Sequence, residues 1–197
     1  MKTKHVRVLP YSPRWKEEFS KIRRELEQAL SDCPGRALSN LHVGSTAVEG
    51  LAAKPVIDVD VVVRKGAFHA FPAVRESMEK AGYLYEGNLG IEGREAFRCE
   101  KKEYLMERHL YVCGEGSREL SRHPAFRDWL RTHPADRDAY GARKLEAARR
   151  HPEDIGGYTE EKAPVIEEIY RRCGLAVQGG PQDGGRYGQR ESCKPDE

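Results

Sequence analysis

Two carboxylates on one short segment are the side chains of this sequence best suited to chemistry. Residues 56–63 read VIDVDVVV, a run of β-branched residues interrupted only by Asp58 and Asp60. Such a run predicts a buried strand, on which side chains two positions apart share a face, with Cα atoms about 6.5 to 7 Å apart. Two buried carboxylates repel each other and resist desolvation. A hard cation such as Mg²⁺ would relieve both costs, because it binds carboxylate oxygens and keeps waters and phosphates as its other ligands.

A glycine and a serine lie upstream of this strand, where the chain could hold a phosphate. Residues 38–43 predict another short strand, which ends at Gly44 and Ser45. Glycine lets the backbone approach a ligand closely, and Ser45 could cap a short helix whose N-terminal end favours an anion. Lys54, between this turn and the second strand, is a further phosphate-binding candidate, with an ordinary surface lysine as the alternative. Each motif alone is common, but together they indicate metal-assisted phosphoryl transfer.

Several separate blocks of this sequence resemble the GrpB-like family, a branch of the polymerase beta-like nucleotidyltransferase superfamily. The main block, HVGSTAVEGLAAKPVIDVDVVV at residues 42–63, contains both features described above. Further matching blocks follow in the family's order: VLPYSPRW at 8–15 with Phe19, HLYV at 109–112, FRDWLR at 126–131, His133 with Pro134, Tyr140, and Tyr158 with Lys162. The resemblance covers about residues 6–173, and several motifs in the right order make it specific.

The resemblance implies an activity and a set of site residues. The activity is transfer of a nucleoside monophosphate from a nucleoside triphosphate to an acceptor, with pyrophosphate leaving. Asp58 and Asp60 would be catalytic and would hold Mg²⁺ or Mn²⁺. Gly44, Ser45 and Lys54 would bind the triphosphate. The nucleotide base, the acceptor and the oligomeric state are left open by the sequence.

Two positions depart from the family's pattern. Glu49 stands where the family usually has proline, so the turn after the Gly-Ser pair is less restricted. The superfamily generally places a third carboxylate on a neighbouring strand, and the matching segment here is Glu107–Val112. His109 takes the inward position there, with Glu107 two residues earlier on the same face of a regular strand. His109 is therefore the third catalytic candidate, as acceptor orienter or general base, and a third metal-binding carboxylate is left open.

Two other classes of function remain open. The chain could be a catalytically silent nucleotide-binding or regulatory module that keeps the fold and the two aspartates. It could also be an interaction partner of another enzyme, with its helical half as the docking surface. Metal-dependent nucleotide binding followed by a screen for pyrophosphate release separates these classes from the enzyme.

Other charged residues and histidines carry weaker expectations. Arg94 and Arg98 could contact substrate, but solvated charges at the sheet edge are the favoured interpretation. His42, next to the Gly-Ser turn, is expected to be a hydrogen-bonded structural residue. Lys144 and Lys162 are candidates for binding the nucleotide or the acceptor, and Arg127 is expected to pair locally with Asp128.

The order of predicted elements indicates an α+β fold. The predicted helices cover about residues 13–31 and 68–81, and most of 117–172, where Pro134 opens one helix and Pro164 marks either the start or a kink of the last. The further predicted strands cover residues 83–86, 96–101 and 106–113. The expected architecture is a nucleotidyltransferase-like mixed sheet with helices packed mainly on one side, followed by a helical C-terminal part.

Length and composition limit the remaining possibilities. Residues 1–175 are expected to form one domain, and residues 176–197, rich in glycine and polar residues, a disordered tail. The net charge of +2 does not favour nucleic-acid binding. No run of eighteen apolar residues or signal-like N-terminus occurs, so a cytoplasmic location without membrane partners is the default expectation. The five scattered cysteines form no CxxC pair, which disfavours structural zinc and a disulfide framework.

Overall fold

The computed structural model of the chain describes residues 5–33, 37–64, 71–99 and 104–175. The predicted tail, residues 176–197, lies outside the described residues. The helices are α1 (Arg14–Ala29), α2 (Phe71–Lys80), α3 (Arg118–Thr132), α4 (Pro134–Arg150) and α5 (Ile155–Arg172), with a short 3-10 helix η1 (Ser45–Ala47). The strands are β1 (Ala37–Val43), β2 (Ile57–Val63), β3 (Tyr83–Gly87), β4 (Arg94–Cys99) and β5 (Arg108–Gly114).

These strands form a mixed sheet in the order β1-β2-β5-β4-β3. β2 and β5 run parallel, and the other neighbouring pairs are antiparallel. A strand that lies between two others and is buried on both faces of the sheet has a nearly continuous apolar sequence. The sequence of β2 has this character. The predicted α+β fold with a mixed sheet and a helical C-terminal part is confirmed.

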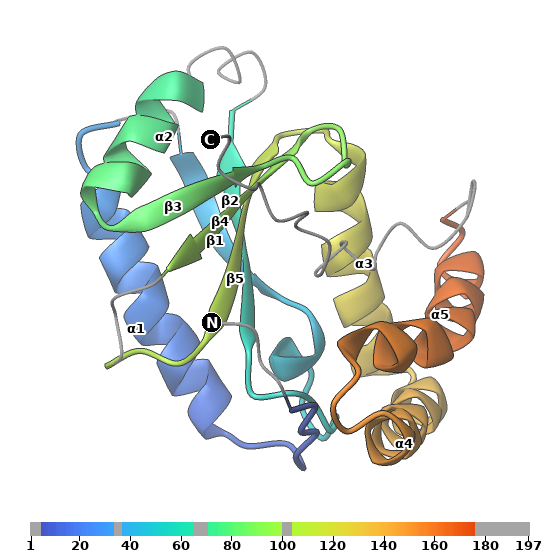
Figure 1. The fold of residues 1–197 in the computed structure, drawn as a ribbon. Helices are drawn as coiled ribbons and strands as arrows, with labels where there is room; N and C mark the ends of the chain where they lie inside the picture. The colour runs from blue at the N-terminus through green and yellow to red at the C-terminus, as the bar shows by residue number, and fades with distance from the viewer. Residues whose placement is uncertain (1–4, 34–36, 65–70, 100–103, 176–197) are drawn as a thin grey trace, which may run out of the picture.

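One face of the sheet is packed against α1 and α2. Alternate residues of β2, namely Ile57, Val59 and Val61, are fully buried on this face. Residues of α1 and α2 that recur at helical spacing cover them: Trp15, Ile22, Leu26, Val74 and Met78. Figure 1 shows both helices on the same side of the sheet. Because side chains alternate along a strand, this packing turns Asp58 and Asp60 to the opposite face.

The helices α3, α4 and α5 form a second layer on that opposite side (Figure 1). Their core includes Phe126, Leu130, Tyr140 and Ile169, together with Val48 and Leu51 from the loop that follows η1. α3 also contacts β1 and β5. The segment between η1 and β2 therefore packs in the helical part and also leads into the sheet. This packing fixes the helical part relative to the sheet.

The helix starts differ in detail from the sequence expectation. α1 begins at Arg14, one residue after the expected start, and Pro13 is its N-cap. α5 begins at Ile155, where the Asp154 side chain accepts from the Gly156 N–H at 2.9 Å, and it continues through Pro164. Pro164 therefore lies inside the helix rather than at its start. Pro134 opens α4, as expected.

None of the helices in the described part of the chain combines the length and the apolar character needed to span a bilayer.

Candidate active site

Asp58 and His109 face each other across the parallel strands β2 and β5. They are direct register partners, and Asp58 Oδ1 lies 2.9 Å from His109 Nδ1. Since a carboxylate can only accept, His109 donates from Nδ1. Burial opposes ionisation of Asp58, but the hydrogen bond from His109 and the nearby Lys54 and His123 hold its pKa below the usual range. Asp58 is thus an ionised carboxylate, with 28% of its side chain exposed to solvent.

Gly44 lies directly against Asp58. Its φ of +69° and ψ of −171° belong to a region that only glycine adopts readily. A Cβ at this position would come 2.1 Å from Asp58 Oδ2. The glycine of the predicted Gly-Ser turn is therefore required both by its backbone conformation and by the space that the carboxylate occupies. Ser45, the first residue of η1, does not cap the helix with its side chain.

Two arginines of α3 hold this turn against the helical layer. Arg127 Nη1 donates to the carbonyl of His42 at 2.9 Å. Arg131 donates from Nε and Nη2 to the carbonyl of Ala47, at 3.2 and 2.8 Å. Arg127 also pairs with Asp128 at 2.8 Å, which confirms the local pair expected from the sequence. Both ends of the turn are thereby fixed by one helix.

His42 is a buried structural residue, as its position next to the turn suggested. The Thr46 hydroxyl donates to the carbonyl of Val56, so it accepts from His42 Nε2 at 3.0 Å. The ring of Phe19 stacks on the imidazole with centroids 4.7 Å apart. Burial, together with nearby Arg131 and Arg127, lowers the pKa of His42 to about 4. His42 is therefore neutral at physiological pH.

Asp60 is completely buried and is contacted by a histidine that the sequence analysis did not identify. His123 Nδ1, from α3, lies 3.1 Å from Asp60 Oδ1 and 3.0 Å from Oδ2. Nε2 of the same ring lies 3.5 Å from Oε2 of Glu119, one turn earlier on the helix. Although burial alone would lower the pKa of His123, hydrogen bonds to the two carboxylates raise it to about 10. The result is a buried Asp60, His123, Glu119 chain.

Three lysines from the helical layer and the loop before β2 lie around two tyrosines. Lys54 Nζ and Lys162 Nζ lie 5.7 and 5.0 Å from the ring centre of Tyr158. Lys144 Nζ lies 4.4 Å from the ring centre of Tyr140. Lys144 and Lys54 both interact electrostatically with Asp58. All three lysines were candidates in the sequence, which does not indicate that Lys54 and Lys144 interact with this carboxylate or that Lys162 lies near Lys144.

Lys144 is an unusual lysine, because only 2% of it is exposed. Its Nζ atom is buried and has no hydrogen-bond acceptor among the described residues. Burial and the neighbouring Lys162 lower the pKa of Lys144 well below its ordinary value, while Asp58 opposes this shift. A buried amino group without a hydrogen-bond partner costs free energy, which a bound anion would recover.

The sequence left Glu107 and His109 as alternatives for the third position, and the structure separates them. Glu107 is exposed and lies one residue before β5, where its carbonyl accepts from the Ile57 N–H at 2.9 Å. His109 is the residue that contacts Asp58. Within the described ranges, no set of three His, Cys, Asp or Glu side chains gathers as metal ligands. Asp58, which is partly exposed, could be one ligand of an ion whose other ligands would be water and phosphate oxygens, as is usual for Mg²⁺.

Arg94 was expected to be a solvated charge, and this expectation is wrong. Only 6% of Arg94 is exposed, and its guanidinium lies 4.5 Å from the ring centre of Tyr111. β4 begins at this residue, two positions earlier than expected. Arg94 is therefore part of a strand and not of the preceding turn. Arg98 does pair at the surface with Glu86, at 3.4 Å.

Comparison with known proteins shows which family this chain matches. The family model described as "GrpB protein" matches residues 5–172. A UPF0157 protein of Halalkalibacterium halodurans is 32% identical over 171 residues, which are 85% of this chain and 82% of that protein. A dephospho-CoA kinase of Mycolicibacterium paratuberculosis is 30% identical over 191 residues, covering 85% of this chain but 46% of the kinase.

Two solved structures extend the comparison. The GrpB protein of Enterococcus faecalis is 32% identical, with a TM-score of 0.71 over 84% of this chain and 98% of that one. Cid1, in complex with its short product ApU, has a TM-score of 0.50 at 13% identity, over 73% of this chain and 43% of Cid1. At that identity the similarity to Cid1 shows the fold alone, and the fold is nucleotidyltransferase-like.

Substituting Gly44 by alanine tests the contact between the turn and Asp58. Gly44→Ala adds a Cβ 2.1 Å from Asp58 Oδ2 to a backbone conformation that itself costs about 1–3 kcal/mol for alanine. Gly116→Ala is the matched control, because Gly116 also has a positive φ, +83°, but no atom within 4 Å of the added Cβ. Urea unfolding should show a clearly larger loss of stability for Gly44→Ala. Equal losses would contradict the close contact.

The depressed pKa of His42 predicts a stability difference at mildly acidic pH. The unfolded chain takes up a proton near pH 6.5, whereas the folded chain does so only near pH 4, so the folded state loses stability as pH falls through this window. The loss between pH 7 and pH 4 is about 3 kcal/mol. His42→Gln keeps a donor towards Thr46 and does not titrate. The difference in unfolding free energy between wild type and His42→Gln should change by that amount, and a constant difference would contradict the assignment.

Proposed function

This chain belongs to the GrpB family, and we propose that it is a metal-dependent nucleotidyltransferase, which transfers a nucleoside monophosphate from a nucleoside triphosphate to an acceptor. The observation that carries the proposal is Asp58, packed against the glycine of the Gly-Ser turn, together with Lys144, which interacts with it electrostatically. One is an ionised, partly exposed carboxylate, and the other is a buried amino group without a hydrogen-bond acceptor among the described residues. A metal-bound triphosphate has the charge pattern to satisfy both.

The lysines supply the phosphate-binding half of the proposed site. Lys54, Lys144 and Lys162 come from the loop before β2, from α4 and from α5. Ammonium groups that lie together repel one another, and burial adds a desolvation cost. Phosphate oxygens offer charge-assisted hydrogen bonds that offset both costs. Gly44 and Ser45 add backbone N–H groups at the start of η1. The first N–H groups of a helix have no acceptor within the helix, so they can donate to a phosphate.

Asp58 supplies the metal-binding half. Asp58 would hold Mg²⁺ or Mn²⁺, and the ion would neutralise the triphosphate and favour in-line attack at the α-phosphorus. Gly44 leaves room for the Asp58 carboxylate, and His109 orients it through Nδ1. With Nδ1 as the donor, His109 Nε2 is the proton-accepting atom of the ring, suited to take a proton from an acceptor hydroxyl.

A second candidate function is a nucleotide-binding module that regulates or assists another enzyme. It is favoured by the match to a protein named dephospho-CoA kinase, in which the matched region accounts for 46% of the length. In that case the same lysines and Asp58 would bind a nucleotide without releasing pyrophosphate. Turnover with candidate acceptors separates the two functions, since both require nucleotide binding.

Substitution of Asp58 by asparagine tests the metal-binding half. Asp58→Asn should lower the affinity for a non-hydrolysable triphosphate analogue at least tenfold in the presence of Mg²⁺, because the ion loses its protein carboxylate. In EDTA the affinity should stay the same or rise, because a negative charge near the phosphates has been removed. Isothermal titration calorimetry in both buffers measures this difference.

The matched control for that experiment is Asp138→Asn, which changes an exposed aspartate of α4 that pairs only with the neighbouring Arg137 among the described residues. It should bind the analogue as wild type does in both buffers. If Asp58→Asn also kept the Mg²⁺ dependence of wild type, the assignment of Asp58 to the metal would be wrong.

Substitution of Lys144 by methionine tests the phosphate-binding half. Methionine keeps most of the length of the side chain and removes the buried amino group. Lys144→Met should weaken metal-free analogue binding at least tenfold and raise the melting temperature of the unliganded protein, because a group that lacks a hydrogen-bond partner is no longer buried. Calorimetry and thermal unfolding measure the two effects.

Lys80→Met provides the control, because Lys80 is an exposed lysine that pairs with Glu76 at 2.8 Å on α2. Its analogue affinity should equal that of wild type. A Lys144→Met protein that binds the analogue normally but melts at a lower temperature would show that Lys144 has a structural role instead.

A further inference from the structure

Asp60 is enclosed by the protein, although it lies on the same face of β2 as Asp58. Its side chain is 0% exposed, whereas 28% of the Asp58 side chain is accessible. His123 Nδ1 lies at nearly equal distances, 3.1 and 3.0 Å, from both carboxylate oxygens. The two aspartates that a sequence motif presents as a pair are therefore different in their surroundings.

This contact decides whether a metal ion can reach Asp60. A divalent ion such as Mg²⁺ must approach a carboxylate oxygen to about 2.0–2.1 Å and bring water or phosphate ligands with it. The ring of His123 occupies the side of Asp60 on which both oxygens are presented, and no solvent reaches the side chain. Asp58 differs in its access to solvent, since 28% of its side chain is exposed, and His109 lies within hydrogen-bond distance of its Oδ1.

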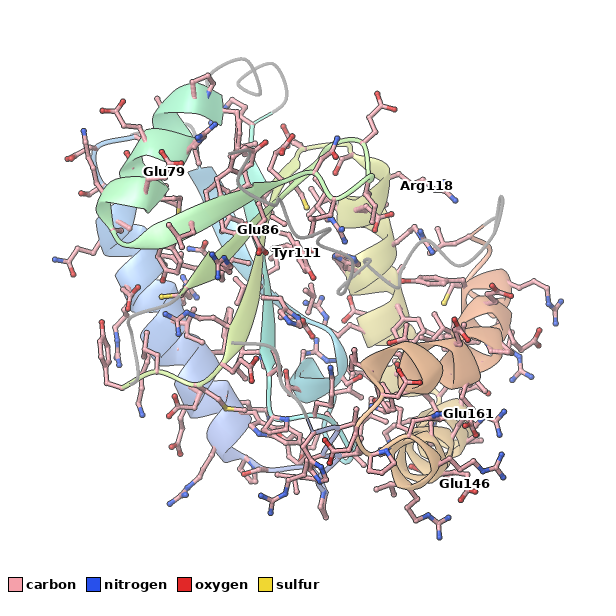
Figure 2. All side chains as sticks on the ribbon, in the orientation of Figure 1. Glu79, Glu86, Tyr111, Arg118, Glu146 and Glu161 are labelled. Atoms are coloured by element: carbon pink, nitrogen blue, oxygen red, sulfur yellow. The ribbon has the colours of Figure 1, made fainter. Side chains whose placement is uncertain are left out.

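The position of His123 is fixed from several directions. Glu119 contacts its second ring nitrogen at 3.5 Å, and Arg122 in turn pairs with Glu119 at 3.1 Å. The ring of Tyr111, labelled near the centre of Figure 2, lies 6.0 Å from the imidazole. Moving His123 away from Asp60 would break the contact with Asp60 and disturb the contact with Glu119. Both are buried carboxylates, so this movement is costly.

The helix that carries His123 is itself held against the site. Its next two turns carry Arg127 and Arg131, which donate to the carbonyls of His42 and Ala47 on either side of the Gly-Ser turn. A shift of α3 that released Asp60 would therefore also pull on the turn that contacts Asp58. The enclosure of Asp60 and the geometry around Asp58 belong to one rigid arrangement.

We infer that His123 is a positioning residue that keeps Asp60 out of the set of metal ligands, so that the site takes one divalent ion, through Asp58, instead of two. This inference rests on the proposed function, because it concerns the metal centre of that site. His123 occupies the place at Asp60 that a second ion would need. Asp60 then has a structural role, which is to hold α3 against β2 through His123.

The test is the number of Mn²⁺ ions bound per chain, measured by electron paramagnetic resonance of free Mn²⁺ with and without a saturating non-hydrolysable triphosphate analogue. The wild-type chain with the analogue should bind one ion. His123→Ala uncovers both oxygens of Asp60 and should bind two. A merely structural role of His123 would lower thermal stability without adding an ion.

Two further variants keep the inference testable if His123→Ala does not fold. Asp60→Asn should still bind one ion, because Asp60 is not a ligand, whereas Asp58→Asn should lose the ion. Loss of the ion in Asp60→Asn would overturn the inference. Ion binding is compared only for variants whose circular dichroism spectra match that of wild type, because such variants are folded.

Each pattern of results gives a decision. Two ions in wild type, or one ion in both wild type and His123→Ala, would overturn the role of His123 and leave the proposed function standing. No ion in wild type but one in His123→Ala would support the enclosure of Asp60 and contradict the proposed function. No ion and no analogue bound by either protein would overturn both.

Discussion

The structure depends on the placement of two carboxylates on the interior strand β2, where each one needs a specific partner. Asp58 is compensated by His109 from β5, by Lys54 from the loop before β2 and by Lys144 from α4. Asp60 is compensated by His123 from α3. A carboxylate on a central strand without such a partner would cost several kcal/mol of desolvation. The helical C-terminal part therefore completes the surroundings of Asp60, because α3 brings His123 to this carboxylate.

The connection between the sheet and the helices explains how this compensation is held in place. Val48 and Leu51, in the segment between the Gly-Ser turn and β2, are buried with residues of α3, α4 and α5. The arginines of α3 fix the turn through its carbonyl oxygens. The same segment thus belongs to the hydrophobic core of the helical layer and to the wall of the candidate site. Residues from β2, β5, α3, α4 and the turn are kept together by this shared packing, not by local sequence.

Local features of the site could be predicted from the sequence, and long-range ones could not. The strand of Asp58 and Asp60 follows from a run of β-branched residues, and Gly44 was identified as a point of close approach. His123 was missed because it pairs with Asp60 across 63 residues, and no pattern around it predicts which helix face meets the sheet. The burial of Arg94 was missed because it depends on where β4 begins. Lys144 was named, but its burial depends on how α4 packs.

We propose that this GrpB family protein binds a metal-bound nucleoside triphosphate between Asp58 and the lysines around it. The most direct measurement is anomalous diffraction from crystals grown with Mn²⁺ and a non-hydrolysable triphosphate analogue. We expect a Mn²⁺ peak at coordination distance from an Asp58 oxygen and a phosphate group within hydrogen-bond distance of Lys144 Nζ. An analogue bound elsewhere, or a Mn²⁺ peak away from Asp58, would contradict it.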